Sequence, residues 1–358
     1  MARRIRSTIF SRAIQRSLKA LTRSTVRAGT KAMTQALLPS KPVIRKPAVR
    51  KPVARKRVPA KTTAVRPKVA ATLKLPNSFT AGIAGAQRYW LFVPPGRPRN
   101  ERMPLMVMLH GCSQTAEGFA ASTRMNQIAA KEGFAVLYPE QNKLANLQGC
   151  WNWHRTNSGK AQSEADAIVA TMLQVCQRHA IEPARMALAG LSAGASMAAL
   201  LAVRHPALFR AVAMHSGVAP GIAHSLVGAL KAMRGHSVAT PLLPLLPGKH
   251  LPTLLVIQGS ADPLVAPSNG STVAQLWATR EAAKPGQPRV VQRGARHAAT
   301  VTDYKTKDRL VASLYDIKGL GHAWSGGAAS QDYSDPKGPD ASRLIWAFAR
   351  KQFAKLPA

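Results

Sequence analysis

The sequence has few acidic residues, few aromatic residues and few cysteines. Among its 358 residues, 15 are Asp or Glu against 51 Lys or Arg, and only 5% are aromatic. The shortage of acids excludes a uniformly acidic enzyme, and the 46% of apolar residues excludes a chain that is disordered throughout. Three cysteines are too few for a disulfide scaffold, and none has companions at metal-ligand spacing, so we expect neither a metal nor a cofactor. No apolar run approaches the ~18 residues of a membrane span.

The first hundred positions contain no acidic residue, and the first acid of the chain is Glu101. Residues 1–72 contain 20 Lys and Arg, which leaves 31 bases and 15 acids, a net charge of +16, for the rest of the chain. A block of like charges repels itself and has no face to bury in a core. The sequence therefore predicts a basic tail (residues 1–72), followed by one folded domain (residues 73–358).

The basic tail has two parts. Residues 3–22 alternate apolar and basic side chains at helical spacing, which predicts an amphipathic helix suited to an anionic surface. Residues 39–72 contain the pentads KPVIR, KPAVR and KPVAR, whose prolines favour a disordered, extended chain. One interpretation is a solvated extension; the other is binding to an anionic surface, a polymer granule or nucleic acid.

From Leu73 onward, short apolar runs alternate with amphipathic segments. Strands are expected at residues 88–93, 105–109, 135–138, 186–189, 211–214, 254–257 and 311–317, and helices near residues 117–132, 163–179, 193–205, 268–282 and 341–355. This alternation predicts an α/β domain with a mostly parallel sheet covered by helices on both faces.

The segment around Ser192 has the pattern of a nucleophile turn. Gly190-Leu-Ser192-Ala-Gly194 runs from an expected strand into a helix of small residues. A serine on such a sharp turn needs glycines two residues to either side, where a Cβ would collide with neighbouring backbone. The alternative is that both glycines only permit tight packing. We expect Ser192 to be the nucleophile.

A serine nucleophile needs a histidine base and a carboxylate that orients it, in the order Ser, Asp, His for this kind of sheet. Asp262 follows the expected strand at residues 254–257, and His322 lies in a glycine-rich segment after the strand at residues 311–317. We expect these two residues to complete a triad. The main rival base, His215, also follows a strand but precedes Asp262 in the chain.

Amide donors for the oxyanion should come from the residue after the nucleophile and from the loop after the strand at residues 105–109. We assign them to the backbone amides of Ala193 and Cys112. A plain tight turn at His110-Gly111 is the alternative interpretation of that loop.

Several motifs together resemble the polyhydroxybutyrate depolymerase family of esterases. They are LHGCSQTA from Leu109, RMN from Arg124, YPEQ from Tyr138, GCWNW from Gly149, AGLSAG from Ala189, HSG from His215, GHAWSGG from Gly321 and DPKGPDAS from Asp335. The resemblance covers the chain from about Lys74 onward. It implies an α/β-hydrolase fold and hydrolysis of carboxylic esters through Ser192, Asp262 and His322.

The resemblance also implies a choice of substrates. We expect a serine esterase acting on polyhydroxyalkanoate or 3-hydroxybutyrate oligomer esters, with feruloyl or acetyl esters of plant polysaccharides as the alternative. A hypothesis of another class is a granule- or nucleic-acid-associated protein that acts through its basic tail. Most family members are secreted, but the basic tail lacks the compact apolar stretch of a signal peptide. A location in the cytoplasm or on the surface of a polymer granule is therefore an equal alternative to secretion.

Two further groups of residues lie next to the expected site. Cys112 and Cys150 flank it, and a disulfide between them would make the oxyanion loop rigid; the sequence leaves open whether it forms. Trp151, Trp153 and Trp324 are candidates for an apolar wall along the acyl chain, with core packing as the alternative for each. Cys176 is expected to be a buried small hydrophobe.

Overall fold

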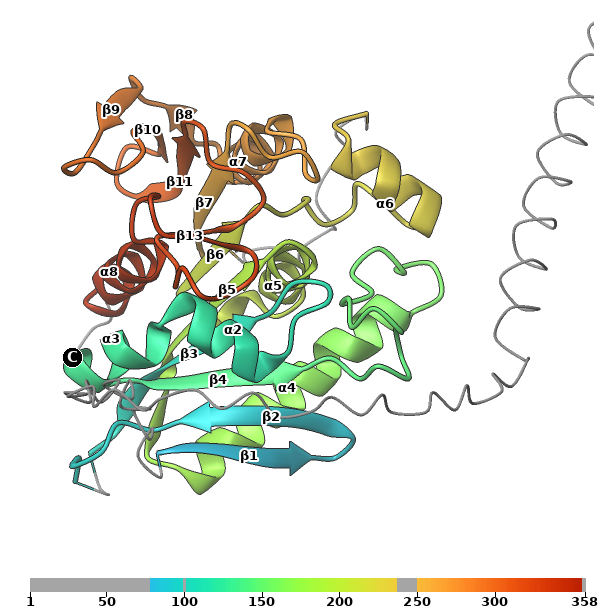
Figure 1. Cartoon of the computed structure of the whole chain (residues 1–358), viewed down its shortest axis with the longest axis vertical. Helices are drawn as coiled ribbons and strands as arrows, with labels where there is room; N and C mark the ends of the chain where they lie inside the picture. Colours follow the sequence, from blue (N-terminus) through green and yellow to red (C-terminus); the bar gives the residue numbers. More distant parts are fainter. Residues whose placement is uncertain (1–77, 99–100, 237–249, 356–358) are drawn as a thin grey trace, which may run out of the picture. The chain divides into compact units, whose positions relative to one another are not determined.

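The computed structural model describes residues 78–98, 101–236 and 250–355 (Figure 1). The expectations for the basic tail, with its helix at 3–22 and its disordered part at 39–72, lie outside the described residues. Within these ranges no helix is both long and apolar enough to cross a membrane.

A central sheet organises the described chain. Its strands are β1 (Phe79–Ala84), β2 (Gln87–Phe92), β3 (Met103–Leu109), β4 (Ala135–Glu140), β5 (Ile181–Leu191), β6 (Ala211–His215), β7 (Thr253–Gly259), β8 (Lys284–Pro285), β9 (Arg289–Val291), β10 (Ala299–Lys305) and β11 (Leu310–Ile317). The strand order is β1-β2-β4-β3-β5-β6-β7-β11-β10-β8, with β9 paired to β10. The six strands from β4 to β11 are mutually parallel, and the strands outside them pair antiparallel. The prediction of a mostly parallel sheet is confirmed.

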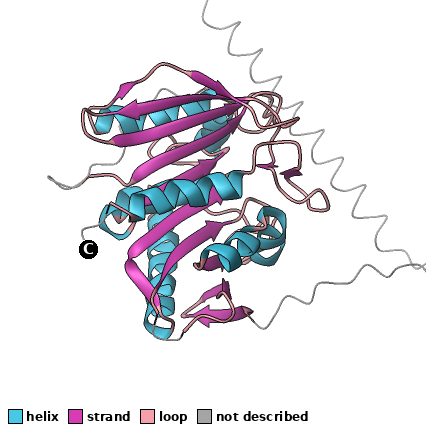
Figure 2. Cartoon of the chain, turned by 90° about the vertical axis from the view of Figure 1, so that its left-hand side faces the viewer, coloured by secondary structure: helices cyan, strands magenta, loops and turns pink. Residues whose placement is uncertain are grey.

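Helices cover both faces of this sheet (Figure 2). They are α2 (Ala116–Thr123), α3 (Met125–Glu132), α4 (Lys160–Arg178), α5 (Ala193–Arg204), α6 (Leu226–Met233), α7 (Ser268–Arg280) and α8 (Ala341–Phe353), with a short 3-10 helix at Pro206–Leu208. Successive side chains of a strand point to opposite faces. In β3, Val107 therefore joins a core with α4, α5 and α7, whereas Met106 and Met108 join a second core with α2, α3 and α8.

The prediction of a single helix near residues 117–132 is wrong. The structure has two helices, α2 and α3, which meet at Arg124 in the left-handed conformation with φ 55°. A right-handed helix cannot continue through such a residue. The Arg124 guanidinium donates hydrogen bonds to the carbonyl groups of Gly326 and Gly327, so a contact about 200 residues away in sequence accompanies the break.

Candidate active site

Ser192 lies on a strained turn between β5 and α5. Its backbone has φ 56° and ψ −119°, a region that side chains other than glycine rarely adopt, at a typical cost of ~1–3 kcal/mol. A Cβ on Gly190 would overlap the backbone of Gly194, and a Cβ on Gly194 would overlap the carbonyl oxygen of Leu109. Gly190 therefore lets α5 approach β5, and Gly194 lets α5 approach the end of β3, both at backbone contact. The turn projects Ser192 from the carboxyl end of β5.

Asp262 and His322 are brought together from loops that follow β7 and β11. The Nδ1 atom of His322 lies 2.8 Å from Oδ2 and 3.1 Å from Oδ1 of Asp262, and both side chains are buried. Because β5, β6, β7 and β11 are adjacent and parallel, the loops after them meet at one edge of the sheet. The sequence-predicted acid and base are therefore a hydrogen-bonded pair at the same edge as Ser192.

The Asp262 carboxylate is held in its charged form. Burial by itself raises its pKa, but hydrogen bonds from His322 and from the amides of Val265 and Leu264, with the charge of His322, lower the pKa below its usual value. The two amides donate to Oδ1 at 2.9 and 3.0 Å. The loop thus fixes a negative carboxylate against Nδ1 of the His322 imidazole, as a base-orienting acid would be placed.

His215, the rival base, is placed differently. Its Nε2 atom accepts a hydrogen bond from the Ser325 amide at 3.1 Å, and its ring stacks on Trp324. Burial lowers its pKa to about 3; the nearby His322 lowers it as well, while Asp262 opposes the shift. The His215 carbonyl accepts a hydrogen bond from the Ser192 amide at 2.9 Å. His215 is a neutral, buried residue that supports the site.

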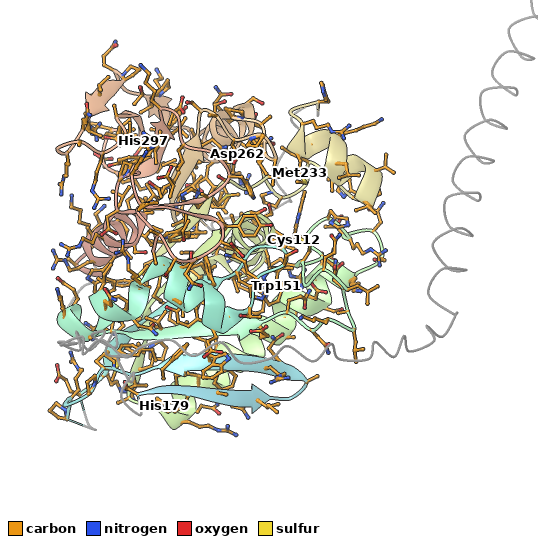
Figure 3. All side chains as sticks on the ribbon, in the orientation of Figure 1. Cys112, Trp151, His179, Met233, Asp262 and His297 are labelled. Carbon is orange, nitrogen blue, oxygen red and sulfur yellow. A yellow bond between two sulfur atoms is a disulfide. The ribbon has the colours of Figure 1, made fainter. Side chains whose placement is uncertain are left out.

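The loop after β3 lies against the nucleophile. A Cβ built on Gly111 would be 3.6 Å from the Ser192 Cβ atom, so the next residue, Cys112, begins close to the serine. Cys112 forms a disulfide with Cys150, with 4.3 Å between the Cα atoms, and the two are cross-linked close to Trp151 (Figure 3). The pairing that the sequence left open is present in the structure.

The neighbouring His110 is also neutral. Burial lowers the pKa of its imidazole, against smaller opposing effects from the Gly111 carbonyl and the charge of Glu140. Its Nε2 atom accepts from the Gln141 amide at 3.1 Å. His110 therefore ties the loop after β3 to the loop after β4.

The three tryptophans expected near the site are all buried. Trp151 donates from its indole nitrogen to the His110 carbonyl, and Trp324 donates to the Ser342 hydroxyl. Trp153 lies in the same core as Trp151. Burial of this kind favours the packing alternative for these residues over an acyl-chain wall.

Tyr333 is a residue at the site that the sequence reasoning missed. Its ring packs edge-on against His322 with 6.4 Å between the centroids, and 40% of its surface is exposed. Its φ is 53°, so this aromatic residue also has a strained backbone. It precedes the short strand β13 (Ser334–Asp335), which pairs with β12 (Trp324–Ser325), just after His322. A strained, exposed ring beside the base is a signal that only the folded structure shows.

Outside this site, the described residues hold one cysteine that is not in a disulfide. Cys176, on α4, is half-buried, and burial raises the pKa of its thiol to about 11, so it is an uncharged thiol. Among the described residues there is no group of three or more His, Cys, Asp or Glu side chains that could hold a metal ion.

Comparison with known proteins places the chain among carboxylic ester hydrolases. Residues 87–278, more than half of the chain, match the family model described as "Esterase PHB depolymerase". Poly(3-hydroxyalkanoate) depolymerase C of Paucimonas lemoignei is 34% identical over 194 residues, covering 51% of this chain and 46% of its own length. A probable acetylxylan esterase A of Aspergillus clavatus is 26% identical over 282 residues, 74% of this chain and 87% of that protein.

The solved structure of an acetyl xylan esterase from Aspergillus awamori has the same fold. It aligns with a TM-score of 0.55 at 19% identity, over 68% of this chain and 94% of that one. The predicted α/β-hydrolase fold is confirmed. With a family match across most of the sheet and the site at its carboxyl edge, the chain belongs to the Esterase PHB depolymerase family.

Proposed function

We propose that this protein is a serine esterase that hydrolyses carboxylic esters through an acyl-enzyme on Ser192. The observation that carries the proposal is the buried Asp262–His322 pair at the same sheet edge as the strained Ser192 turn. The amides of Cys112 and Ala193 are the proposed oxyanion donors, because both residues adjoin the nucleophile.

The reaction follows from the roles of these groups. The Ser192 Oγ atom attacks the ester carbonyl while His322 Nε2 takes the hydroxyl proton, and the carbonyl oxygen becomes an oxyanion that the two amides stabilise. The intermediate collapses, the C–O bond to the alcohol breaks, and His322 returns the proton to the departing oxygen. Water then attacks the acyl-enzyme with His322 again acting as the base, which releases the acid and restores Ser192.

For the substrate, we infer an ester of a polyhydroxyalkanoate or of its 3-hydroxybutyrate oligomers. The Paucimonas lemoignei depolymerase, at 34% identity, supports this choice. Acetyl or feruloyl esters of plant polysaccharides are the second candidate, which relatives named acetylxylan esterase and feruloyl esterase support. Binding of an anionic surface or nucleic acid by the basic tail, and residence of the enzyme on a polymer granule, remain separate proposals.

The decisive variant is Ser192→Ala. We expect it to lose the acyl-enzyme burst and to lower kcat on p-nitrophenyl butyrate by roughly 10⁵- to 10⁶-fold, because the attacking oxygen is removed. Ser163→Ala, at an exposed serine of α4 whose hydroxyl donates to the Gly159 carbonyl, is the matched control and should keep most of the activity. Near-normal turnover by Ser192→Ala would contradict the mechanism. Comparing 3-hydroxybutyrate trimer with methyl ferulate and acetylated xylan then separates the two substrate classes.

A further inference from the structure

The loop between β4 and α4 presents two leucines to solvent. In this leucine loop (residues 142–149), Leu144 is 93% exposed and Leu147 is 91% exposed. Of the other large hydrophobic side chains in the described part of the chain, the most exposed is Val290, at 73%. Single exposed apolar residues are normal on a protein surface, but two fully exposed leucines three residues apart in one loop are a candidate interaction surface.

Hydrogen bonds within the leucine loop hold both leucines outward. The Leu144 amide donates to the Asn142 side-chain oxygen at 2.9 Å, and the Gln148 amide donates to the Asn146 side-chain oxygen at 3.0 Å. The Lys160 ammonium also donates to the Ala145 carbonyl at 2.6 Å. These two asparagine turns fix the backbone on either side of each leucine, so exposure is built into the loop.

The leucine loop is also joined to the proposed oxyanion loop. The Ser113 amide donates to the Gln148 carbonyl at 2.8 Å, and the disulfide joins Cys112, one residue before Ser113, to Cys150, two residues after Gln148. Because β3 and β4 are parallel, both loops leave the same edge of the sheet. The leucine loop is therefore attached to the loop that lies against Ser192.

We propose that the leucine loop adsorbs the enzyme to the surface of a solid polyester and so delivers polymer chains to Ser192. This rests on the proposed esterase function. The loop has one charged residue, Lys143, and no acid, which suits a partner without charge. The side-chain oxygens of Asn142 and Asn146 each already accept an amide of the loop itself, which leaves fewer acceptor sites for the hydroxyl groups of a polysaccharide. An uncharged polyester, with apolar carbons and few donors, matches two leucines better.

The test compares Leu144→Ser/Leu147→Ser with Val290→Ser in the full chain. Val290 is an exposed aliphatic residue on β9, toward the opposite edge of the sheet, and is the matched control. Depletion from a suspension of amorphous poly(3-hydroxybutyrate) particles gives the adsorption constant. Measurements in about 1 M salt, where the Debye length is about 3 Å, suppress any attraction of the basic tail to charge on the particles.

We expect the adsorption constant of the double variant to fall at least about tenfold, because each buried leucine side chain contributes more than enough for such a factor. Release of 3-hydroxybutyrate from particles should fall in parallel. Hydrolysis of soluble p-nitrophenyl butyrate should stay within about twofold, because the chemical step does not use the leucines. Val290→Ser should match the wild type in all three measurements.

Four results would overturn the inference. They are unchanged adsorption of the double variant, an equal loss on the soluble ester, a loss of binding to insoluble xylan in place of the polyester, and a wild-type dimer that dissociates in the double variant. If the wild type hydrolyses no soluble ester, the proposed function fails instead. If it hydrolyses the soluble ester while the double variant adsorbs normally, only the leucine loop's role is refuted.

Discussion

Two histidines follow strands of the same sheet, and the structure gives them opposite environments. His215 ends β6, and both of its ring nitrogens have protein partners, the Ser325 amide and the Ser216 hydroxyl. His322 follows β11, and its Nδ1 faces the Asp262 carboxylate. Only β7 lies between β6 and β11 in the sheet. A place after a strand therefore brings a histidine to the site, but a carboxylate partner and a free nitrogen decide whether it can act as a base.

The same substitution at His322 and at His215 tests whether the two histidines have different roles. We expect His322→Gln to lower kcat on p-nitrophenyl butyrate by roughly 10⁴- to 10⁶-fold, because the proton acceptor is lost. His215→Gln retains an acceptor oxygen for the Ser325 amide, so we expect only a several-fold loss. Steady-state kinetics of both variants, with circular dichroism as a check on folding, measures the contrast. Equal losses would show that the two histidines share one role.

A second substitution tests the partner of His322. Asp262→Asn keeps the shape of the side chain but replaces the charged acceptor, so the imidazole can adopt the wrong tautomer. We expect kcat to fall by about 10⁴-fold. Asp303→Asn is the control, because Asp303 is a half-buried carboxylate that also has a lowered pKa but pairs with Arg289, between β10 and β9. A normal kcat for Asp262→Asn would remove the carboxylate from the mechanism.

Buried His215 also makes the free energy of unfolding depend on pH, and this effect is smaller than the changes in kcat. The pKa of His215 is about 3 in the folded protein, mainly because of burial, and about 6.5 in an unfolded chain. Between these values only the unfolded chain binds the proton, so the free energy of unfolding falls as pH decreases from about 6.5 towards 3. His215→Gln removes this linkage, and we expect a shallower decline by up to one proton. Urea titrations at several pH values measure the slope; an unchanged slope would mean that His215 is protonated in the fold.

The pattern of the candidate site was accessible from sequence because its residues follow strands in a fixed order. Ser192, Asp262 and His322 each carry a local signal of glycines or turn residues, and a parallel sheet brings such segments to one edge. The side-chain environment was not accessible. The buried partners of His215 are Ser325 and Trp324, more than a hundred residues away in sequence, and no local sequence pattern predicts these contacts.

The fold shows the same division between local and distant causes. The buried parallel strands β3 to β7 were predicted because each is a continuous apolar run. The strand β10 was missed because its sequence, ATVTDYK, alternates apolar and polar residues and so contains no continuous apolar run; it pairs with β11 on one side and with β8 and β9 on the other. The break between α2 and α3 at Arg124 was missed because no glycine or proline in the sequence indicates a left-handed backbone there.

The backbone contact that Gly190 and Gly194 allow has a consequence for the timing of catalysis. No side chain lies between Gly194, in the first turn of α5, and the backbone at the end of β3, so the proposed nucleophile and the loop that carries Cys112 start from backbone segments in direct contact. On the proposed mechanism, we therefore expect folding to set the distance between the Ser192 oxygen and the amide donors. Each turnover would then begin with that geometry in place.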